Sequence, residues 1–362
     1  MRSLASSFAA FIALAASVPS ALAQLPNVPP GVIATGTQGP TNPPQPTLGT
    51  AINQTSYARL LSVNSIDDFC IFAPPTQSAI ADSETIEVAW CTKQRNNARV
   101  IPDGTITGVS FLKNDYYVQL IGYGDFTQLN IPFGDYGGEL DPHGAYGSGN
   151  PIGGNVTSNI SGGDVPYAEW MLYIDYNQFC LRVCTNANST YSAASMCWHE
   201  LDEMGCEFVM PGNYNVNGTF ESCDADVAYP PGWYPTATVD GTTQFSEFAQ
   251  RYTGTLSDGS VYTVGDLATP AAPYFTPSSS NCVTTSTIAN NIALASLGVT
   301  GAPANSGPVA SGPTRSGATS GSKPTSAGTT GSTGTPNANS AIGVKGNFGL
   351  IALTVMAGYL FH

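Results

Sequence analysis

Short runs of β-branched and aromatic residues, separated by turns rich in glycine, asparagine and proline, recur through the first half of the chain. The segment Ile86–Trp90 alternates apolar and polar positions, which is typical of a half-buried strand. Two longer runs, Ile106–Leu112 and Tyr116–Ile121, flank Lys113-Asn114-Asp115, and this arrangement predicts a hairpin. Further strands are expected at Phe126–Ile131, Tyr167–Ile174 and Phe179–Val183. The pattern predicts a mainly β fold, a disulfide-stapled β-sandwich or jelly-roll-like domain.

One short helix is predicted at about residues 192–204, where apolar residues recur at helical spacing and Gly205 supplies a C-terminal stop. Its buried stripe would consist of Ala194, Cys197, Leu201 and Met204. The polar residues between them are His199, Glu200, Asp202 and Glu203. We expect these four residues on a solvated face rather than in a catalytic cluster.

The two ends of the chain differ from its middle. Residues 1–23 have the basic end, apolar stretch and small-residue cleavage site of a secretory signal peptide, and a proline-rich leader follows at 24–50. Residues 51–285 are expected to form a single cysteine-rich β domain. Residues 286–340 are predicted to be a disordered, O-glycosylated stalk, because 34 of the 40 residues in 301–340 are Gly, Ser, Thr, Ala or Pro.

The C-terminal residues 341–362 combine a polar spacer with an apolar tail, and small residues precede them. This order is the signal for replacement by a glycosylphosphatidylinositol (GPI) anchor, so the mature protein would be held at the membrane by lipid. We predict Asn337 or Asn339 as the attachment residue, with Gly334 as the alternative. An uncleaved tail that binds membranes loosely is the other interpretation.

The formal net charge is −14, but its distribution is uneven. All 25 acidic residues lie in the region 67–266, which contains six basic residues and so carries about −19. A field of this sign repels phosphate backbones, so we expect no nucleic-acid partner. An acidic extracellular surface is the simpler interpretation.

Eight cysteines lie in the predicted β domain, and an even number in a secreted chain indicates up to four disulfides, with 105 connectivities. They are Cys70, Cys91, Cys180, Cys184, Cys197, Cys206, Cys223 and Cys282. A zinc site is disfavoured because the chain has no paired CxxC motif. Five Asn-X-Ser/Thr sites for N-glycosylation, expected on exposed loops, occur at Asn53, Asn155, Asn159, Asn188 and Asn217.

The glycine-rich loop GDYGGELDPHGAYGSGNPIGG, residues 134–154, contains the strongest candidate chemistry. Its carboxylates Asp135, Glu139 and Asp141 could bind calcium together with backbone carbonyls, although their spacing fits no EF-hand loop. The alternative is structural: glycines supply positive φ and the carboxylates cap turns. His143 is expected to be a loop residue that bonds to backbone. Calcium is thus the one cofactor that the sequence suggests.

The chain shows no motif of a known catalytic class. It contains no HExxH, no Walker loop and no G-x-S-x-G elbow. A glycoside hydrolase or lyase stays open because it needs only two suitably spaced carboxylates, first among them Glu139 with Asp141, or Glu169 with Asp175.

A carbohydrate-binding surface is a further hypothesis. Trp233 and Tyr234 lie in the proline-bounded segment Tyr229–Pro235, where flat rings could stack on sugars. The plainer interpretation is a turn whose rings cover the edge of the core.

Several distinctive segments resemble one family. They are DFCIFAPP (68–75), IEVAWCTK (86–93), RVIPDGTITGV (99–109), GGELDPHG (137–144), FCLRVC (179–184) and MGC (204–206). Together they are similar to the fungal proteins labelled macrophage-activating glycoproteins, over about residues 65–285. The resemblance implies a cell-surface or cell-wall glycoprotein and provides no catalytic residues. Tyr146 departs from the family, where an acidic residue is expected.

The leading hypothesis is therefore a secreted, GPI-anchored cell-surface or cell-wall protein without catalytic activity. Its expected partners are cell-wall polysaccharide or a host-cell surface. A carbohydrate-binding module and a glycan-active enzyme that uses acidic residues are the two alternatives.

Overall fold

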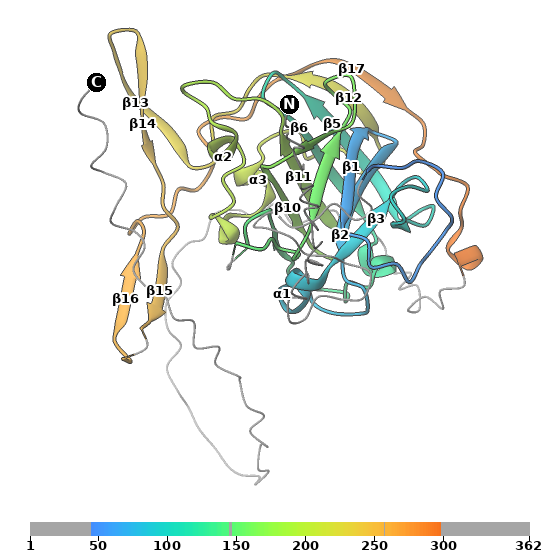
Figure 1. The fold of residues 1–362 in the computed structure, drawn as a ribbon. Coiled ribbons are helices and arrows are strands. Elements are labelled where there is room, and N and C mark those ends of the chain that lie inside the picture. The colour runs from blue at the N-terminus through green and yellow to red at the C-terminus, as the bar shows by residue number, and fades with distance from the viewer. Residues whose placement is uncertain (1–44, 145–146, 257, 298–362) are drawn as a thin grey trace, which may run out of the picture.

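The structure is a computed structural model that describes residues 45–144, 147–256 and 258–297. Two sheets dominate this part of the chain (Figure 1). The six-stranded sheet has the order β4 (Arg99–Val100), β3 (Val88–Cys91), β2 (Asp68–Ala73), β1 (Leu60–Ser65), β8 (Asn155–Ser158) and β9 (Val165–Tyr167). The seven-stranded sheet has the order β17 (Ser279–Thr285), β12 (Phe220–Ala225), β5 (Ile106–Lys113), β6 (Tyr117–Gly124), β11 (Gln178–Cys184), β10 (Trp170–Ile174) and β7 (Gly138–Leu140). Both sheets contain parallel and antiparallel pairs, and the predicted mainly β fold is confirmed.

One apolar layer joins the two sheets. Phe69 of β2 and Phe179 of β11 lie with ring centroids 5.9 Å apart, and Phe72 of β2 and Trp170 of β10 lie 5.5 Å apart. All four rings are buried. Burial of each large apolar side chain contributes roughly 1.5–3 kcal/mol, so this layer is the main source of stability.

The outer face of the seven-stranded sheet is covered as well. Along β10, Leu172 enters the layer between the sheets, whereas Met171 and Tyr173 point to the other side. There they meet a second apolar cluster that includes Phe208 and Val209 of the helix α3 (Cys206–Val209). The outward-facing side chains of β10 are therefore buried under α3 and its neighbouring segments.

Two hairpins form small sheets of their own. One consists of β13 (Trp233–Val239) and β14 (Thr242–Glu247), and the other of β15 (Tyr252–Thr255) and β16 (Val261–Val264). Most of their residues are exposed, and Figure 1 shows both beside the two large sheets.

The hairpin predicted at Lys113-Asn114-Asp115 is confirmed, because β5 pairs antiparallel with β6. The Asn114 side-chain oxygen accepts from the backbone N–H groups of Tyr116 and Tyr117, at 2.9 and 3.0 Å. The strand predicted at Phe126–Ile131 is wrong, since a 3-10 helix spans Phe126–Leu129. Asp125 caps that helix at Thr127, and Asn130 ends it with a φ of 70°.

The helix predicted at 192–204 is only partly present. The helix α2 spans Ala193–Met196, with the Ser192 side chain as its N-cap. The chain leaves the helix at Cys197, which is bonded to Cys184 of β11. A 3-10 turn at Asp202–Met204 and the helix α3 follow. The disulfide thus overrides the helical periodicity. Earlier in the chain, the helix α1 (Ile80–Ser83) is followed directly by a 3-10 turn at Glu84–Ile86.

All eight cysteines are paired, which fixes the connectivity that the sequence left open. The pairs are Cys70–Cys91, Cys180–Cys206, Cys184–Cys197 and Cys223–Cys282. In the unfolded-state entropy model, a disulfide contributes typically 2–4 kcal/mol.

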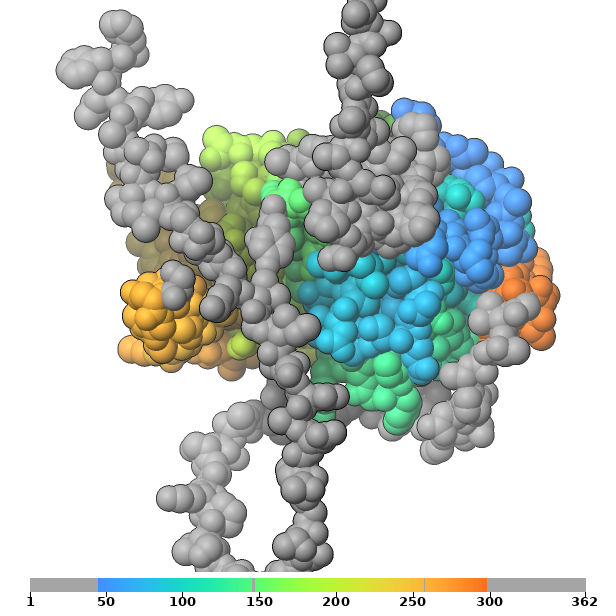
Figure 2. Space-filling model, turned by 60° about the horizontal axis from the view of Figure 1, so that its bottom comes forward, coloured from blue at the N-terminus to red at the C-terminus, as the bar shows by residue number. Residues whose placement is uncertain are grey.

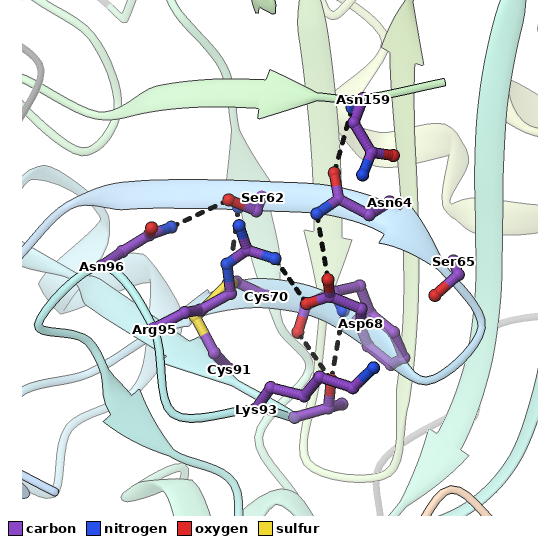
Figure 3. A network of polar contacts seen from close by, with 12 residues as sticks. Ser62, Asn64, Ser65, Asp68, Cys70, Cys91, Lys93, Arg95, Asn96 and Asn159 are labelled. Atoms are coloured by element: carbon purple, nitrogen blue, oxygen red, sulfur yellow. Dashed lines mark hydrogen bonds and ion pairs between the residues drawn. A yellow bond between two sulfur atoms is a disulfide. The ribbon is translucent and has the colours of Figure 1, made fainter. Parts of the chain in front are cut away.

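A polar network fixes the join between β1, β2 and the turn after β3 (Figure 3). Asp68 accepts from Nη1 of the buried Arg95 at 2.5 Å and from the Asn64 amide at 3.0 Å. Asn96, whose φ is 56°, donates to the Ser62 hydroxyl at 2.9 Å. Because every member is held by another, we interpret this network as structural support for the Cys70–Cys91 bridge beneath it.

Both ends of the described chain contact the sandwich. Leu48, in the predicted leader, forms an isolated bridge with Arg95. Near the C-terminal end, the Asn290 amide donates to the carbonyls of Thr92 and Ile101, each at 2.9 Å, so contacts continue past residue 285. Figure 2 shows this last segment, in orange, beside the N-terminal part in blue. A 3-10 turn at Leu294–Leu297 follows.

The predicted signal peptide, most of the leader and stalk, and the anchor signal with Asn337 and Asn339 lie outside the described residues. Across 45–144, 147–256 and 258–297, no helix is long and apolar enough to cross a lipid bilayer.

Glu87, next to β3, is a buried acid with incomplete pairing. Its Oε1 accepts from the Ser83 hydroxyl at 3.2 Å, whereas Oε2 has no hydrogen-bond partner among the described residues. Burial raises the pKa of Glu87 well above its usual range; Glu84 and Asp135 act in the same direction, and Arg59 opposes them. The Arg59 guanidinium is itself buried, which lowers its pKa to about 10.

The substitution Glu87→Gln should make stability less dependent on pH. A carboxyl with a raised folded-state pKa keeps a proton that the unfolded chain releases, so the wild-type free energy of unfolding falls as pH rises above about 4.5. The amide introduced by the substitution cannot ionise. The free energy of unfolding of the variant should therefore rise relative to that of the wild type between about pH 4 and pH 8. Urea denaturation at both pH values tests this, and parallel pH profiles would contradict it.

The edge strand β17 should depend on one disulfide. Every residue of β17 is exposed, so backbone pairing with β12 and the Cys223–Cys282 bond hold it. In a Cys223→Ala/Cys282→Ala variant, amide hydrogen exchange should rise across residues 279–285 while β6 and β11 stay protected. Mass spectrometry of the exchanged peptides measures both. Unchanged exchange in β17, or loss of protection throughout the sheet, would be evidence against this prediction.

Candidate functional site

Glu139 and Asp141 project from the same side of the edge strand β7. This strand pairs antiparallel with β10 and places Glu139 opposite Tyr173. Because side chains alternate along a strand, Leu140 enters the layer between the sheets, while Glu139 and Asp141 lie on the outer side. Both carboxylates are almost fully buried, with 7% and 2% of their surface exposed.

The loop that follows β7 fixes the Asp141 carboxylate. The backbones of Asp141 and Asn150 exchange two hydrogen bonds, at 2.9 and 2.8 Å, and close the loop between them. Within it, Asp141 Oδ1 accepts from the backbone N–H groups of His143 and Gly144, at 2.6 and 2.8 Å. Gly144 has a φ of +57°, which favours glycine at this turn.

Two histidines lie against these carboxylates. His199 Nδ1 lies 3.6 Å from Asp141 Oδ1, and the rings of His199 and His143 stack with centroids 5.1 Å apart. His143 Nε2 lies 3.0 Å from Glu169 Oε2, so this side chain pairs with a carboxylate rather than with backbone as predicted. The Tyr173 hydroxyl donates to the His199 carbonyl at 3.2 Å, which positions His199 over the sheet.

The segment that carries His199 is held at both ends by disulfides. Cys197 is bonded to Cys184 and Cys206 to Cys180, and both partners belong to β11. The segment between Cys197 and Cys206 is therefore fastened to the outer face of the sheet. The predicted solvated face is confirmed for Glu200, Asp202 and Glu203, which are exposed, although they do not share one helix. It is wrong for His199, because the clamped segment turns this side chain toward Asp141.

Further carboxylates increase the negative charge. We define the Glu139 cluster as Glu139, Asp141 and His199 together with Glu84 and Asp202. Burial raises the pKa of Glu139 well above its usual range, with Asp141 and Asp202 adding to the effect. The pKa of Glu84 is also raised, mainly by burial. Asp202 is exposed and lies at the rim of the cluster. In the described part of the chain, no lysine or arginine forms an ion pair with this cluster.

Three members of the cluster are close enough to share one ion. Ligand atoms of Glu139, Asp141 and His199 all lie within 4.8 Å of one another. Glu139 Oε1 is buried and has no hydrogen-bond partner among the described residues. A second such group surrounds Glu221, but its two sulfurs form the Cys223–Cys282 bond and cannot act as thiolate ligands.

The structure brings together two of the three residues of the predicted calcium site. Asp135 caps backbone instead, since its Oδ2 accepts from the N–H groups of Ile80 and Gly137, each at 3.2 Å. His199 takes the third place beside Glu139 and Asp141. The calcium hypothesis itself stays a prediction.

A pocket of about 440 Å³ lies beside the cluster. Gly138, Tyr173 and Asp202 line it, so it adjoins the residues that flank Glu139. Asp175, another predicted glycosidase residue, also lines the pocket, while its Oδ1 caps the turn at Asn177. Glu139 and Asp141 are thus buried but lie close to an open pocket.

The predicted carbohydrate-binding rings lie in a different place, at the base of the β13–β14 hairpin. Trp233 is half-buried and packs against Phe245 and Tyr191, with centroids 5.1 and 6.4 Å away. The Tyr234 hydroxyl donates to the carbonyl of Ala272 at 2.6 Å. These contacts suit rings that cover a core edge, and sugar binding stays a prediction.

The five predicted glycosylation sites differ in exposure. Asn159, Asn188 and Asn217 are exposed, whereas Asn53 and Asn155 are half-buried. Their modification stays a prediction.

Comparison with known proteins places these features in a fungal context. The chain is 41% identical over 244 residues to appressorium protein ROW1 of Mycosarcoma maydis, covering 66% of this chain and 51% of that protein. It is 40% identical over 192 residues to appressorium protein ROW2 of the same species, covering 52% of this chain and 65% of that protein. The chain is a homologue of two fungal appressorium proteins.

The chain therefore spans about half of the first relative and less than two thirds of the second. No family model and no solved structure matches it. The fungal relationship implied by the resemblance is supported, whereas the finer resemblance to macrophage-activating glycoproteins stays a prediction. The four disulfides agree with an extracellular protein.

The sequence pattern predicts one part of this site, the two acids near β7, but not the residues that join them from other segments. In Glu139-Leu-Asp141, two acids alternate with an apolar residue, a pattern that places both acids on one face of a strand. His199, Glu84 and Asp202 come from remote segments, and no spacing in the sequence connects them with β7.

Asn150 should be a sensitive position near the cluster. Its amide donates to Glu84 Oε2 at 3.1 Å and to the Glu139 carbonyl at 2.9 Å. Asn150→Ala would leave both acceptors without this donor, which should lower the free energy of unfolding by about 1–3 kcal/mol. Urea denaturation measures the change, and Asn215→Ala, at an exposed site, is the control. Equal stability of the two variants would contradict the assigned role.

Proposed function

We propose that this chain is an extracellular surface protein of a fungal cell that acts at the appressorium. The homology with ROW1 and ROW2 of Mycosarcoma maydis carries the proposal. In this view the β domain is held outside the cell on a glycosylated stalk, attached to membrane or wall through a GPI anchor at Asn337 or Asn339.

The chemistry of the described residues supports an extracellular location. All eight cysteines are oxidised, a state that persists in oxidising compartments and is rare in the cytosol. Acidic residues also outnumber basic residues, and a net negative charge helps to keep a protein on the cell surface soluble.

We further propose that the domain acts through contacts rather than catalysis. Cell-wall polysaccharide or a host-cell surface would be the partner, and the exposed hairpins β13–β14 and β15–β16 are accessible for such contacts. A glycan-active enzyme receives less support. Glycosidase carboxylates usually lie about 5–10 Å apart across an open cleft, whereas ligand atoms of Glu139 and Asp141 lie within 4.8 Å and are nearly buried.

The anchor can be tested on the protein in its host cell. Phosphatidylinositol-specific phospholipase C should move the protein from the detergent phase to the aqueous phase, because the enzyme removes the lipid tail. A chain truncated after residue 340 should appear in the medium without enzyme treatment. Persistence of the full chain in the detergent phase after a verified digestion would exclude the anchor.

The site of action needs a separate measurement. A fluorescent protein inserted after the signal peptide should mark the appressorium surface of living cells. Fluorescence confined to the cytoplasm would contradict the proposed location whatever the outcome for the anchor.

A further inference from the structure

Two features of the Glu139 cluster have no explanation in a surface protein that acts by contact alone. A buried oxygen, Glu139 Oε1, lacks a hydrogen-bond partner among the described residues. No lysine or arginine in the described ranges forms an ion pair with the neighbouring carboxylates. Buried carboxyl groups in proteins are generally protonated, paired or bound to metal. A second carboxylate and an imidazole within 4.8 Å of Glu139 favour metal binding here.

We propose that Glu139, Asp141 and His199 bind one divalent transition-metal ion, with zinc as the first candidate. The three side chains supply two carboxylate oxygens and one imidazole nitrogen, donors that zinc and manganese accept. Three protein ligands leave room for water at a further position, as in zinc sites that keep an open coordination position.

The spacing of the ligand atoms agrees with a single ion. Zinc binds nitrogen and carboxylate oxygen at about 2.0–2.2 Å, so neighbouring ligand atoms in a tetrahedral site lie about 3.4 Å apart. His199 Nδ1 and Asp141 Oδ1 are 3.6 Å apart, which is longer than an N–H···O hydrogen bond. One carboxylate oxygen of Glu139, one of Asp141 and one ring nitrogen of His199 all lie within 4.8 Å of one another. Small side-chain rotations would bring all three onto one ion.

The surrounding contacts hold the ligands in position. The N–H groups of His143 and Gly144 orient Asp141, and the Tyr173 hydroxyl holds the His199 carbonyl. The stacked ring of His143 supports His199 from the side. Such outer contacts maintain ligand geometry in known metal sites.

The donor set disfavours calcium. Calcium takes six to eight oxygen ligands, which requires several carboxylates and carbonyls around one point. Here a nitrogen occupies one of three positions, and Asp135 is engaged by backbone N–H groups instead. The chemistry therefore favours a transition metal over calcium.

Metal titration of the full chain tests the site. Untagged protein, secreted by a eukaryotic host and treated with chelator, would be titrated with Zn²⁺, Mn²⁺ and Ca²⁺ by isothermal calorimetry. We expect one equivalent of Zn²⁺ to bind at least tenfold more tightly than Ca²⁺. His199→Gln and Glu139→Gln should each weaken Zn²⁺ binding at least tenfold. Glu207→Gln removes an exposed acid on the same face, beside the pocket, and should leave binding unchanged.

Three outcomes would overturn the proposal. They are the absence of one-to-one Zn²⁺ or Mn²⁺ binding, tighter binding of Ca²⁺, and equal Zn²⁺ affinity in wild type and in folded His199→Gln protein. Far-ultraviolet circular dichroism establishes whether each variant is folded.

A second measurement needs no variant. Diethylpyrocarbonate modifies accessible imidazole nitrogens, and mass spectrometry of the peptides identifies which histidine has reacted. Zn²⁺ should reduce the modification of His199 at least fivefold, while His143, with 42% of its side chain exposed, remains reactive. Equal modification of His199 with and without Zn²⁺ would overturn the proposal even if the variants do not fold.

Discussion

The pairing of β7 with β10 determines the direction in which the acidic residues of this protein face. Glu139 lies opposite Tyr173, and the alternation of strand side chains then places Asp141 beside Glu139 and Leu140 in the core. A slip of one residue would bury Glu139 between the sheets and expose Leu140 to the covering loops. Burial of Leu140 in the apolar layer that joins the sheets stabilises this register.

This arrangement concentrates negative charge where the structure offers little compensation. Burial is the largest cause of the raised pKa of Glu84 and of Glu139, and neighbouring carboxylates add to both shifts. Two other buried charges are compensated: Arg95 pairs with Asp68, and Arg182 donates to Gln119 and lies over the ring of Tyr117. Glu87, by contrast, is also only partly paired. What distinguishes the Glu139 cluster is the spacing of its ligand atoms around the unpartnered Glu139 oxygen, and this spacing is the basis of the proposed cation site.

The sequence predicted the strand content, the central hairpin and the disulfide-rich character, because each depends on local pattern or on residue counts. The hairpin at Asn114 was predictable since one side chain satisfies the turn. The helix at 192–204 was mispredicted because hydrophobic periodicity contains no information about the disulfide between Cys197 and Cys184 of a distant strand. The site was half visible, in the alternation Glu139-Leu-Asp141, while His199 reaches it only through the folded path of a remote segment.

The disulfides that hold this remote segment relate the site to the proposed extracellular location. His199 and Asp202 lie between Cys197 and Cys206, and both cysteines are bonded to β11. Without these two bonds, the segment would keep the packing of Leu201 and α3 and a few hydrogen bonds, such as that from Tyr173 to the His199 carbonyl. Such disulfides are rare in the cytosol, so under the proposed extracellular location the two bonds would hold the segment against Glu139 and Asp141 once the chain has been exported. Folding of the cluster would then depend on the oxidising environment that the proposed location provides.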